Sequence, residues 1–94
     1  MNNQPIGIFD SGVGGLTIWQ HINEVLPKES TIYIADSINA PYGEKSTAEI
    51  KALSILSTER LLELGAKIIV VACNTATTSA IKHLRANFKV PFVG

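Results

Sequence analysis

The sequence contains 94 residues, of which 46% are hydrophobic and 17% charged, a composition typical of folded proteins. This length suits one compact α/β unit with a single core and is small for a complete enzyme. Eight Lys and Arg residues balance eight Asp and Glu residues, which disfavours nucleic acid and anionic membranes as partners. The N-terminus lacks the basic and apolar stretches of a signal peptide, and the longest apolar run, residues 68–73, is too short to span a bilayer. We therefore expect a cytoplasmic protein.

The first third of the chain follows the pattern strand, turn, helix. Residues 5–9 form a short apolar segment, and the glycine-rich stretch 10–15 predicts a turn. Apolar residues then recur at three- and four-residue steps up to Pro27, as in an amphipathic helix: Leu16, Trp19, Ile22, Val25 and Leu26. We expect Trp19 to lie in the core.

The middle of the chain predicts a second strand and a longer helix. Residues 31–35 are rich in β-branched and aromatic side chains, whereas residues 36–43 include Pro41 and Gly43 and predict a loop. A helix is expected over residues 46–64, and Gly65 is placed to end it. Its predicted buried face consists of Ile50, Leu53, Leu56, Leu61 and Leu64.

The last third predicts a strand, a helix and a further strand. Ile and Val dominate residues 67–72, which is typical of a parallel strand covered by helices on both faces. Asn74 or Thr75 is expected to cap a third helix, and residues 90–93 predict a fourth strand. The apolar positions of that helix are Ala76, Ala80, Ile81, Leu84 and Phe88. The alternation β-α-β-α-β-α-β predicts an α/β fold with a doubly wound parallel sheet in a three-layer α/β/α arrangement.

Polar residues cluster after each of the first three predicted strands. Ligands of open parallel sheets bind beyond the carboxyl ends of the strands, where loops and helix N-termini converge. The clusters comprise Asp10 and Ser11; Asp36, Ser37, Asn39, Tyr42 and Gly43; and Cys73, Asn74 and Thr75. Their small side chains leave backbone N–H groups accessible, so the pattern favours a site for a small anionic molecule.

Cys73 is the single cysteine of the chain, so it forms no internal disulfide. In a reducing cytosol such a thiol is either a small buried hydrophobe or a reactive group. At the predicted helix N-terminus, the positive end of the helix dipole favours the thiolate, which can act as a nucleophile or a base. Position alone favours core packing, and both interpretations stay open at this point.

The other candidates also have ordinary structural roles. Asp10 and Ser11 are common turn formers before a helix, and Tyr42 can be a packed loop aromatic. His21 and His83 fall on polar helix faces and lack the companions of a metal site, so no metal is expected.

A dinucleotide-binding site is the main alternative. Gly12 and Gly14 begin like the fingerprint GxGxxG, and Asp36 could meet a ribose hydroxyl. The third glycine position is Thr17, however, and the Asp10 carboxylate would face the pyrophosphate. No P-loop motif is present, and no lysine stands at a strand end to hold pyridoxal phosphate. A non-catalytic nucleotide- or anion-binding α/β module remains the alternative interpretation.

Three segments in this order and spacing resemble the glutamate racemases of the aspartate/glutamate racemase family. They are FDSGVGG at residues 9–15, ADSINAPYGEKS at residues 35–46 and VACNTATTSA at residues 71–80. The resemblance covers nearly the whole chain, and PYGEKS points to glutamate racemase over the aspartate and hydantoin racemase relatives. It implies a cytoplasmic isomerase that interconverts L- and D-glutamate for peptidoglycan synthesis, and hence for cell-wall biogenesis and cell shape, without any cofactor.

The resemblance also implies roles for individual residues. Racemisation removes an α-proton from one face of the substrate and returns a proton on the other, so two acid–base groups must flank it. Cys73 corresponds to the first catalytic cysteine of the family, and Asp10 to the acidic residue that assists this thiol and contacts the substrate. The other implied substrate contacts are Ser11, Tyr42, Gly43, Asn74 and Thr75.

The family pattern extends beyond this chain. Residues 1–94 correspond to the main part of the first, N-terminal domain. The second domain, which supplies the other cysteine and a nearby histidine, and a C-terminal return to the first domain are absent from the sequence. We therefore expect the isolated chain to be inactive, and the full-length protein to be a homodimer that acts on glutamate.

Overall fold

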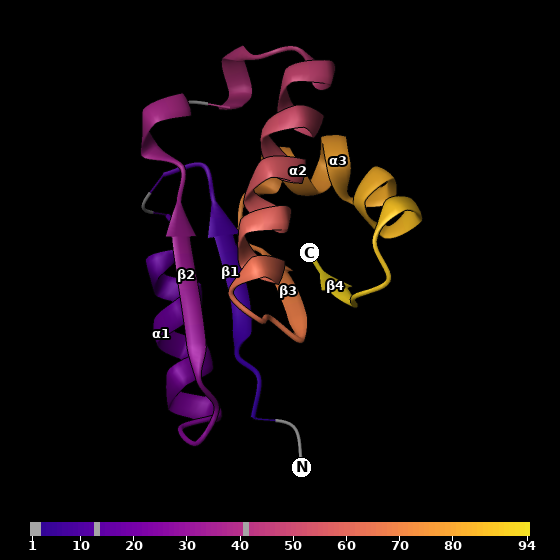
Figure 1. The fold of residues 1–94 in the computed structure, drawn as a ribbon. Helices are drawn as coiled ribbons and strands as arrows, with labels where there is room; N and C mark the ends of the chain where they lie inside the picture. Colours follow the sequence, from indigo (N-terminus) through magenta and orange to yellow (C-terminus); the bar gives the residue numbers. More distant parts are fainter. Residues whose placement is uncertain (1–2, 13, 41) are drawn as a thin grey trace.

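The computed structural model describes residues 3–12, 14–40 and 42–94. Its centre is a four-stranded parallel sheet with the strand order β2-β1-β3-β4. The strands are β1 (Ile6–Asp10), β2 (Thr31–Ala35), β3 (Ile68–Val71) and β4 (Phe92–Val93). They alternate with α1 (Leu16–Val25), α2 (Thr47–Glu63) and α3 (Asn74–Asn87). The predicted α/β class and the predicted order of strands and helices are confirmed (Figure 1).

The structure differs from the predicted elements in the loop after β2 and in the last strand. The loop after β2 contains two short 3-10 helices, η1 (Ser37–Asn39) and η2 (Tyr42–Glu44), while Pro41, on which the loop prediction partly rests, lies outside the described residues. The last strand is shorter than the predicted residues 90–93, because Pro91 has no N–H group to give to the ladder. Among the described residues, no helix is both long enough and apolar enough to cross a membrane.

The helices cover the two faces of the sheet unequally. Phe9, Ile69 and Val71 point to the face covered by α2 and α3 and belong to the buried core. On the opposite face, the indole Nε1 of Trp19 in α1 donates a hydrogen bond of 2.9 Å to Thr31 Oγ1 on β2. Figure 1 shows α1 beside β2, on the far side of the sheet from α2 and α3. The arrangement has the three predicted layers, with one helix on one face and two on the other.

This unequal covering contradicts two predictions. Trp19 does not lie in the core: it is half-buried, and no residue of α1 is fully buried, because α1 packs against the sheet without a neighbouring helix among the described residues. The third strand is not covered equally on both faces. Ile69 is buried, whereas Ile68 and Val70 are only half-buried, because α1 lies over β2 and not over β3.

Both ends of α2 follow from the sequence. Ser46 is the N-cap, and its Oγ accepts a hydrogen bond of 3.2 Å from the backbone N–H of Glu49. Gly65 has a φ of +91°, and the N–H of Ala66 donates to the carbonyl of Leu61 at 3.0 Å. This is a Schellman end, in which a glycine at a positive φ stops the helix.

The buried face of α2 differs from the prediction. Leu56 is 63% exposed and Leu64 is 43% exposed, although both were assigned to the core. The residues that are buried are Ile50, Ser54, Ser57, Thr58 and Leu61. α2 packs against α3 as well as the sheet, and α3 presents the buried small residues Ala76 and Ala80. Close helix packing thus selects small side chains that a hydrophobic pattern does not identify.

The carboxyl ends of β1, β2 and β3 are tied together at one edge of the sheet. The N–H of Asp36, directly after β2, donates to the carbonyl of Asp10 at 2.8 Å. The N–H of Ala72, directly after β3, donates to the carbonyl of Phe9 at 2.9 Å. The first residues of the three following loops therefore start side by side, as the parallel arrangement predicts.

Candidate active site

Cys73 lies at this edge, between β3 and α3. It is the N-cap of α3: its Sγ accepts a hydrogen bond of 3.5 Å from the N–H of Ala76. The prediction that Asn74 or Thr75 caps this helix is therefore wrong. Both residues lie in its first turn, whereas Cys73 has the extended backbone (φ −91°, ψ 121°) that turns a capping side chain back toward the helix.

The thiol connects the core to the polar edge. Cys73 is 6% exposed and belongs to the hydrophobic core, as the packing interpretation holds. Its Sγ also donates a hydrogen bond of 3.3 Å to Ser11 Oγ, in the turn after β1. One side of the thiol therefore meets a polar hydroxyl.

Asp10 organises the turn that carries Ser11. Its Oδ1 accepts a hydrogen bond of 2.7 Å from the N–H of Ser11, and its Oδ2 accepts one of 2.5 Å from the N–H of Gly15. The carboxylate is 5% exposed, so these two N–H groups and the N-terminus of α1 compensate a buried negative charge. Asp10 thus has the turn-forming role that its position suggests. It reaches the thiol through Ser11, which is the hydrogen-bond partner of Cys73.

Tyr42 is buried in the loop after β2, with 1% of its surface exposed. Its hydroxyl donates a hydrogen bond of 2.5 Å to Asp36 Oδ2. Burial, then the hydrogen bond and charge of Asp36, raise the pKa of Tyr42 well above its ordinary value, and the charges of Cys73 and Asp10 add to this. Tyr42 is therefore neutral at physiological pH and lies within electrostatic reach of both residues.

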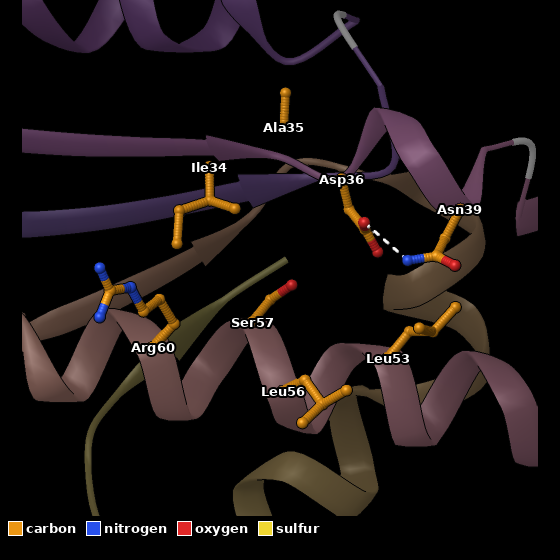
Figure 2. Close-up of a pocket in the computed structure, with 8 residues that line it drawn as sticks. All are labelled: Ile34, Ala35, Asp36, Asn39, Leu53, Leu56, Ser57 and Arg60. Carbon is orange, nitrogen blue, oxygen red and sulfur yellow. Dashed lines mark hydrogen bonds between the residues drawn. The ribbon is translucent and has the colours of Figure 1, made fainter.

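Asp36 lies directly after β2, and its hydrogen bonds within the loop could not be read from the sequence. Besides the hydroxyl of Tyr42, it accepts a hydrogen bond of 2.9 Å from Asn39 Nδ2 through Oδ1 (Figure 2). Both carboxylate oxygens are thus engaged within the loop. This disfavours the nucleotide interpretation, which assigned this carboxylate to a ribose hydroxyl.

Two hollows flank the edge. One, of about 360 Å³, lies at the start of α3 and is lined by Gly43, Asn74, Thr75, Thr78 and Ser79. It brings together three predicted residues, and it adds Thr78 and Ser79, which stand one helical turn after Asn74 and Thr75 and could have been found from that spacing. The other, of about 230 Å³, lies between the end of β2 and α2 (Figure 2). Its lining includes Leu53, Leu56 and Arg60. Among the described residues that line it, Cys73 and Ser11 are not found.

The described residues hold no group of three or more His, Cys, Asp or Glu side chains placed to bind a metal ion. The reactive group at this edge is the Cys73 thiol at the N-terminus of α3. It contacts the hydroxyl of Ser11, whose N–H group in turn donates to the buried carboxylate of Asp10. A thiol so placed is suited to proton transfer or nucleophilic attack, and the neighbouring N–H groups and hydroxyls are suited to an anion.

No protein-family model matches this chain. Comparisons with single sequences and with solved structures both find glutamate racemases that match it over its full length. The glutamate racemase of Corynebacterium diphtheriae is 56% identical over all 94 residues, which cover 36% of that protein. The structure of glutamate racemase isoform RacE1 from Bacillus anthracis has a TM-score of 0.95 and 39% identity, and the match covers 100% of this chain and 35% of that one. The structure of Escherichia coli glutamate racemase in complex with L-glutamate and the activator UDP-MurNAc-Ala has a TM-score of 0.89 and 41% identity. That match covers 97% of this chain and 35% of the Escherichia coli chain. Over its full length this chain is similar in sequence and in fold to glutamate racemases, and it spans about a third of their length.

Proposed function

We propose that this chain is the part of a glutamate racemase that carries the first of its two catalytic cysteines. The full-length enzyme interconverts L- and D-glutamate in the cytoplasm for peptidoglycan synthesis, without a cofactor. The observation that supports this most directly is the hydrogen bond of 3.3 Å from Cys73 Sγ to Ser11 Oγ. It places a helix-capping thiol against the polar turn after β1, where a parallel sheet binds its ligands.

The reaction is a proton transfer across the α-carbon of glutamate. When Cys73 acts as the base, its thiolate takes the α-proton and becomes a thiol, and the electron pair stays on the α-carbon and its carboxylate. A second thiol, expected in a second domain beyond this chain, donates a proton to the opposite face and becomes a thiolate. In the reverse direction the two thiols exchange roles, so the reaction needs no net proton, oxidant or reductant.

The surrounding residues bind the substrate and hold the thiol. Asn74, Thr75 and the backbone of Gly43 line the hollow at the start of α3, where helix N–H groups favour a carboxylate. Ser11 binds substrate beside the thiol, and Asp10 assists by holding Ser11 in place. Tyr42 contributes to the second substrate loop, in which its hydroxyl is fixed by Asp36.

We propose further that the full-length protein is a homodimer with glutamate as its small-molecule partner, and with no nucleic acid or membrane partner. Residues 1–94 contain equal numbers of acidic and basic residues, which supports the absence of a polyanionic partner for this part of the protein.

Circular dichroism tests the proposed function directly. The full-length protein should convert L-glutamate to a mixture of both enantiomers in buffer without added cofactor, and the isolated 94-residue chain should not. A parallel titration with NAD should give no binding, because both oxygens of Asp36 are already engaged. Saturable NAD binding by a full-length protein that leaves glutamate unchanged would instead establish the nucleotide-binding alternative.

A further inference from the structure

Tyr33 on β2 points to the same face of the sheet as Asp10. Tyr33 pairs with Ile8 in the parallel register of β1 and β2, and Asp10 stands two residues after Ile8 on β1. Side chains alternate between the faces of a strand, so all three lie on the face that α1 covers. This is the side of the sheet opposite to the core that contains Cys73.

The hydroxyl of Tyr33 contacts the backbone next to Ser11. It donates a hydrogen bond of 3.2 Å to the carbonyl of Gly12. Burial and the nearby charge of Asp10 raise the pKa of Tyr33, and the backbone N–H of Gly15 partly opposes this rise. The phenol therefore remains a hydrogen-bond donor at neutral pH, close to Gly12, to Gly15 and to the carboxylate that closes the turn.

The turn has little freedom at its α1 end. A Cβ atom on Gly15 would lie 3.0 Å from the Cβ of Asp10 and 3.1 Å from the Cβ of Ala72, so these backbones are packed closely. Asp10 fixes the N–H groups of Ser11 and Gly15. The carbonyl of Gly12, which follows Ser11, is fixed by Tyr33.

We infer that Tyr33 is a positioning residue for the proposed racemase site: its hydrogen bond to Gly12 sets the orientation of Ser11 toward the Cys73 thiol. This inference rests on the proposed function for its catalytic consequence. A chain of contacts runs from Tyr33 through Gly12 and Ser11 to Cys73, and crosses the sheet from the α1 face to the α3 face. Among the described residues, Tyr33 is neither a hydrogen-bond partner of the thiol nor part of the lining of the hollow at the start of α3.

The variant that tests this is Tyr33→Phe in the full-length protein, which removes one oxygen atom and keeps the ring. Loss of an ordinary hydrogen bond that orients a reacting group should lower kcat about 10-fold, while KM for glutamate changes by less than about 2-fold. The matched control is Trp19→Phe, which removes the hydrogen bond of 2.9 Å between Trp19 and Thr31 on the same face of the sheet. The control should lower the melting temperature at least as much as Tyr33→Phe and keep the wild-type kcat.

The possible results separate this inference from the proposed function. If the wild-type protein does not racemise glutamate, the proposed function fails. If it does, and Tyr33→Phe keeps the wild-type kcat, or if kcat falls equally in both variants, the positioning role of Tyr33 is wrong. A measurement on the unaltered protein covers the case in which Tyr33→Phe does not fold. The ¹³Cζ resonance of Tyr33 should titrate at a higher pH than that of free tyrosine, and an ordinary titration would overturn the contact with the turn.

Discussion

Cys73 Sγ and Ser11 Oγ lie 3.3 Å apart although 62 positions separate them in the sequence. The contact joins the end of β3 to the turn after β1, and it exists because β1 and β3 are adjacent parallel strands in register. The same thiol caps α3 through the N–H of Ala76. Cys73 therefore has a structural role and a proposed chemical role, and variants of this residue must separate the two.

The structural role of Cys73 is testable with two substitutions. Cys73→Ala removes the cap of α3, so the free energy of unfolding should fall by about 0.5–2 kcal/mol, the usual cost of losing an N-cap. Cys73→Ser keeps a capping oxygen and should retain most of that stability. Urea denaturation of both variants measures this difference. Equal stability of the alanine and serine variants would show that the thiol does not contribute as a cap.

The close packing beneath the Asp10 turn predicts a strong effect at Gly15. In Gly15→Ala the new Cβ would meet the Cβ atoms of Asp10 and Ala72 at 3.0 and 3.1 Å. This crowding should lower the free energy of unfolding by about 1–3 kcal/mol. The matched control is Gly14→Ala, whose Cβ would have 3.5 Å to Asp10 Oδ2 and should change stability by less than about 0.5 kcal/mol. Similar melting temperatures for the two variants would contradict the packing described here.

The buried hydroxyl of Thr58 predicts a stabilising substitution. Thr58 in α2 has no exposed surface, and its Oγ1 has no hydrogen-bond partner among the described residues. Thr58→Val replaces this hydroxyl by a methyl group of similar size, which should raise the free energy of unfolding by about 1 kcal/mol. Thr77→Val is the control, because Thr77 Oγ1 donates to the carbonyl of Val71 at 3.3 Å and its loss should destabilise. Destabilisation by Thr58→Val would mean that its hydroxyl has a partner in solution.

Stability should decline in alkaline solution because of Tyr42. Its pKa is raised by burial and by the hydrogen bond to Asp36, so the folded state keeps this proton at a pH at which the unfolded chain loses it. The contribution is complete below the unfolded pKa of about 10 and is lost as the pH rises above that value. Tyr33, the only other tyrosine, is shifted in the same direction. The double variant Tyr33→Phe/Tyr42→Phe should thus show a flatter decline above pH ~10 in urea titrations than the wild type. An unchanged slope would contradict the raised pKa values of the two tyrosines.

Much of this fold could be predicted from the sequence because its signals are local. The strand at residues 31–35 coincides with β2, and Ser46 and Gly65 mark the two ends of α2 as expected. The class and order of the elements followed from these signals and from the regular alternation of strands and helices. What failed was the assignment of buried faces. Leu56 is exposed and Ser54 is buried, because packing between α2 and α3 depends on side-chain size and not only on hydrophobicity.

The position of the candidate residues near one edge of the sheet was predictable, but their hydrogen bonds were not. Asp10, Ser11, Tyr42 and Cys73 could be grouped because each lies at or after the carboxyl end of a strand of one parallel sheet. The cap of α3 could not be predicted, because cysteine is an uncommon capping residue and Asn74 and Thr75 are better candidates by residue type. The hydrogen bond between Tyr42 and Asp36 could not be predicted either, because it depends on the path of the loop through η1 and η2.

The measurement that tests the central claim most directly is racemisation of glutamate in heavy water by the full-length protein, with and without Cys73→Ala. If Cys73 is one of two opposed acid–base groups, early product should carry deuterium at the α-carbon while the remaining substrate stays largely unlabelled. Cys73→Ala should lose at least the roughly 10²- to 10⁴-fold that a positioned acid–base group contributes, and should keep its fold despite the weaker cap. A folded Cys73→Ala variant that racemises at the wild-type rate would contradict the account, because Cys73 would then be a packing and capping residue only.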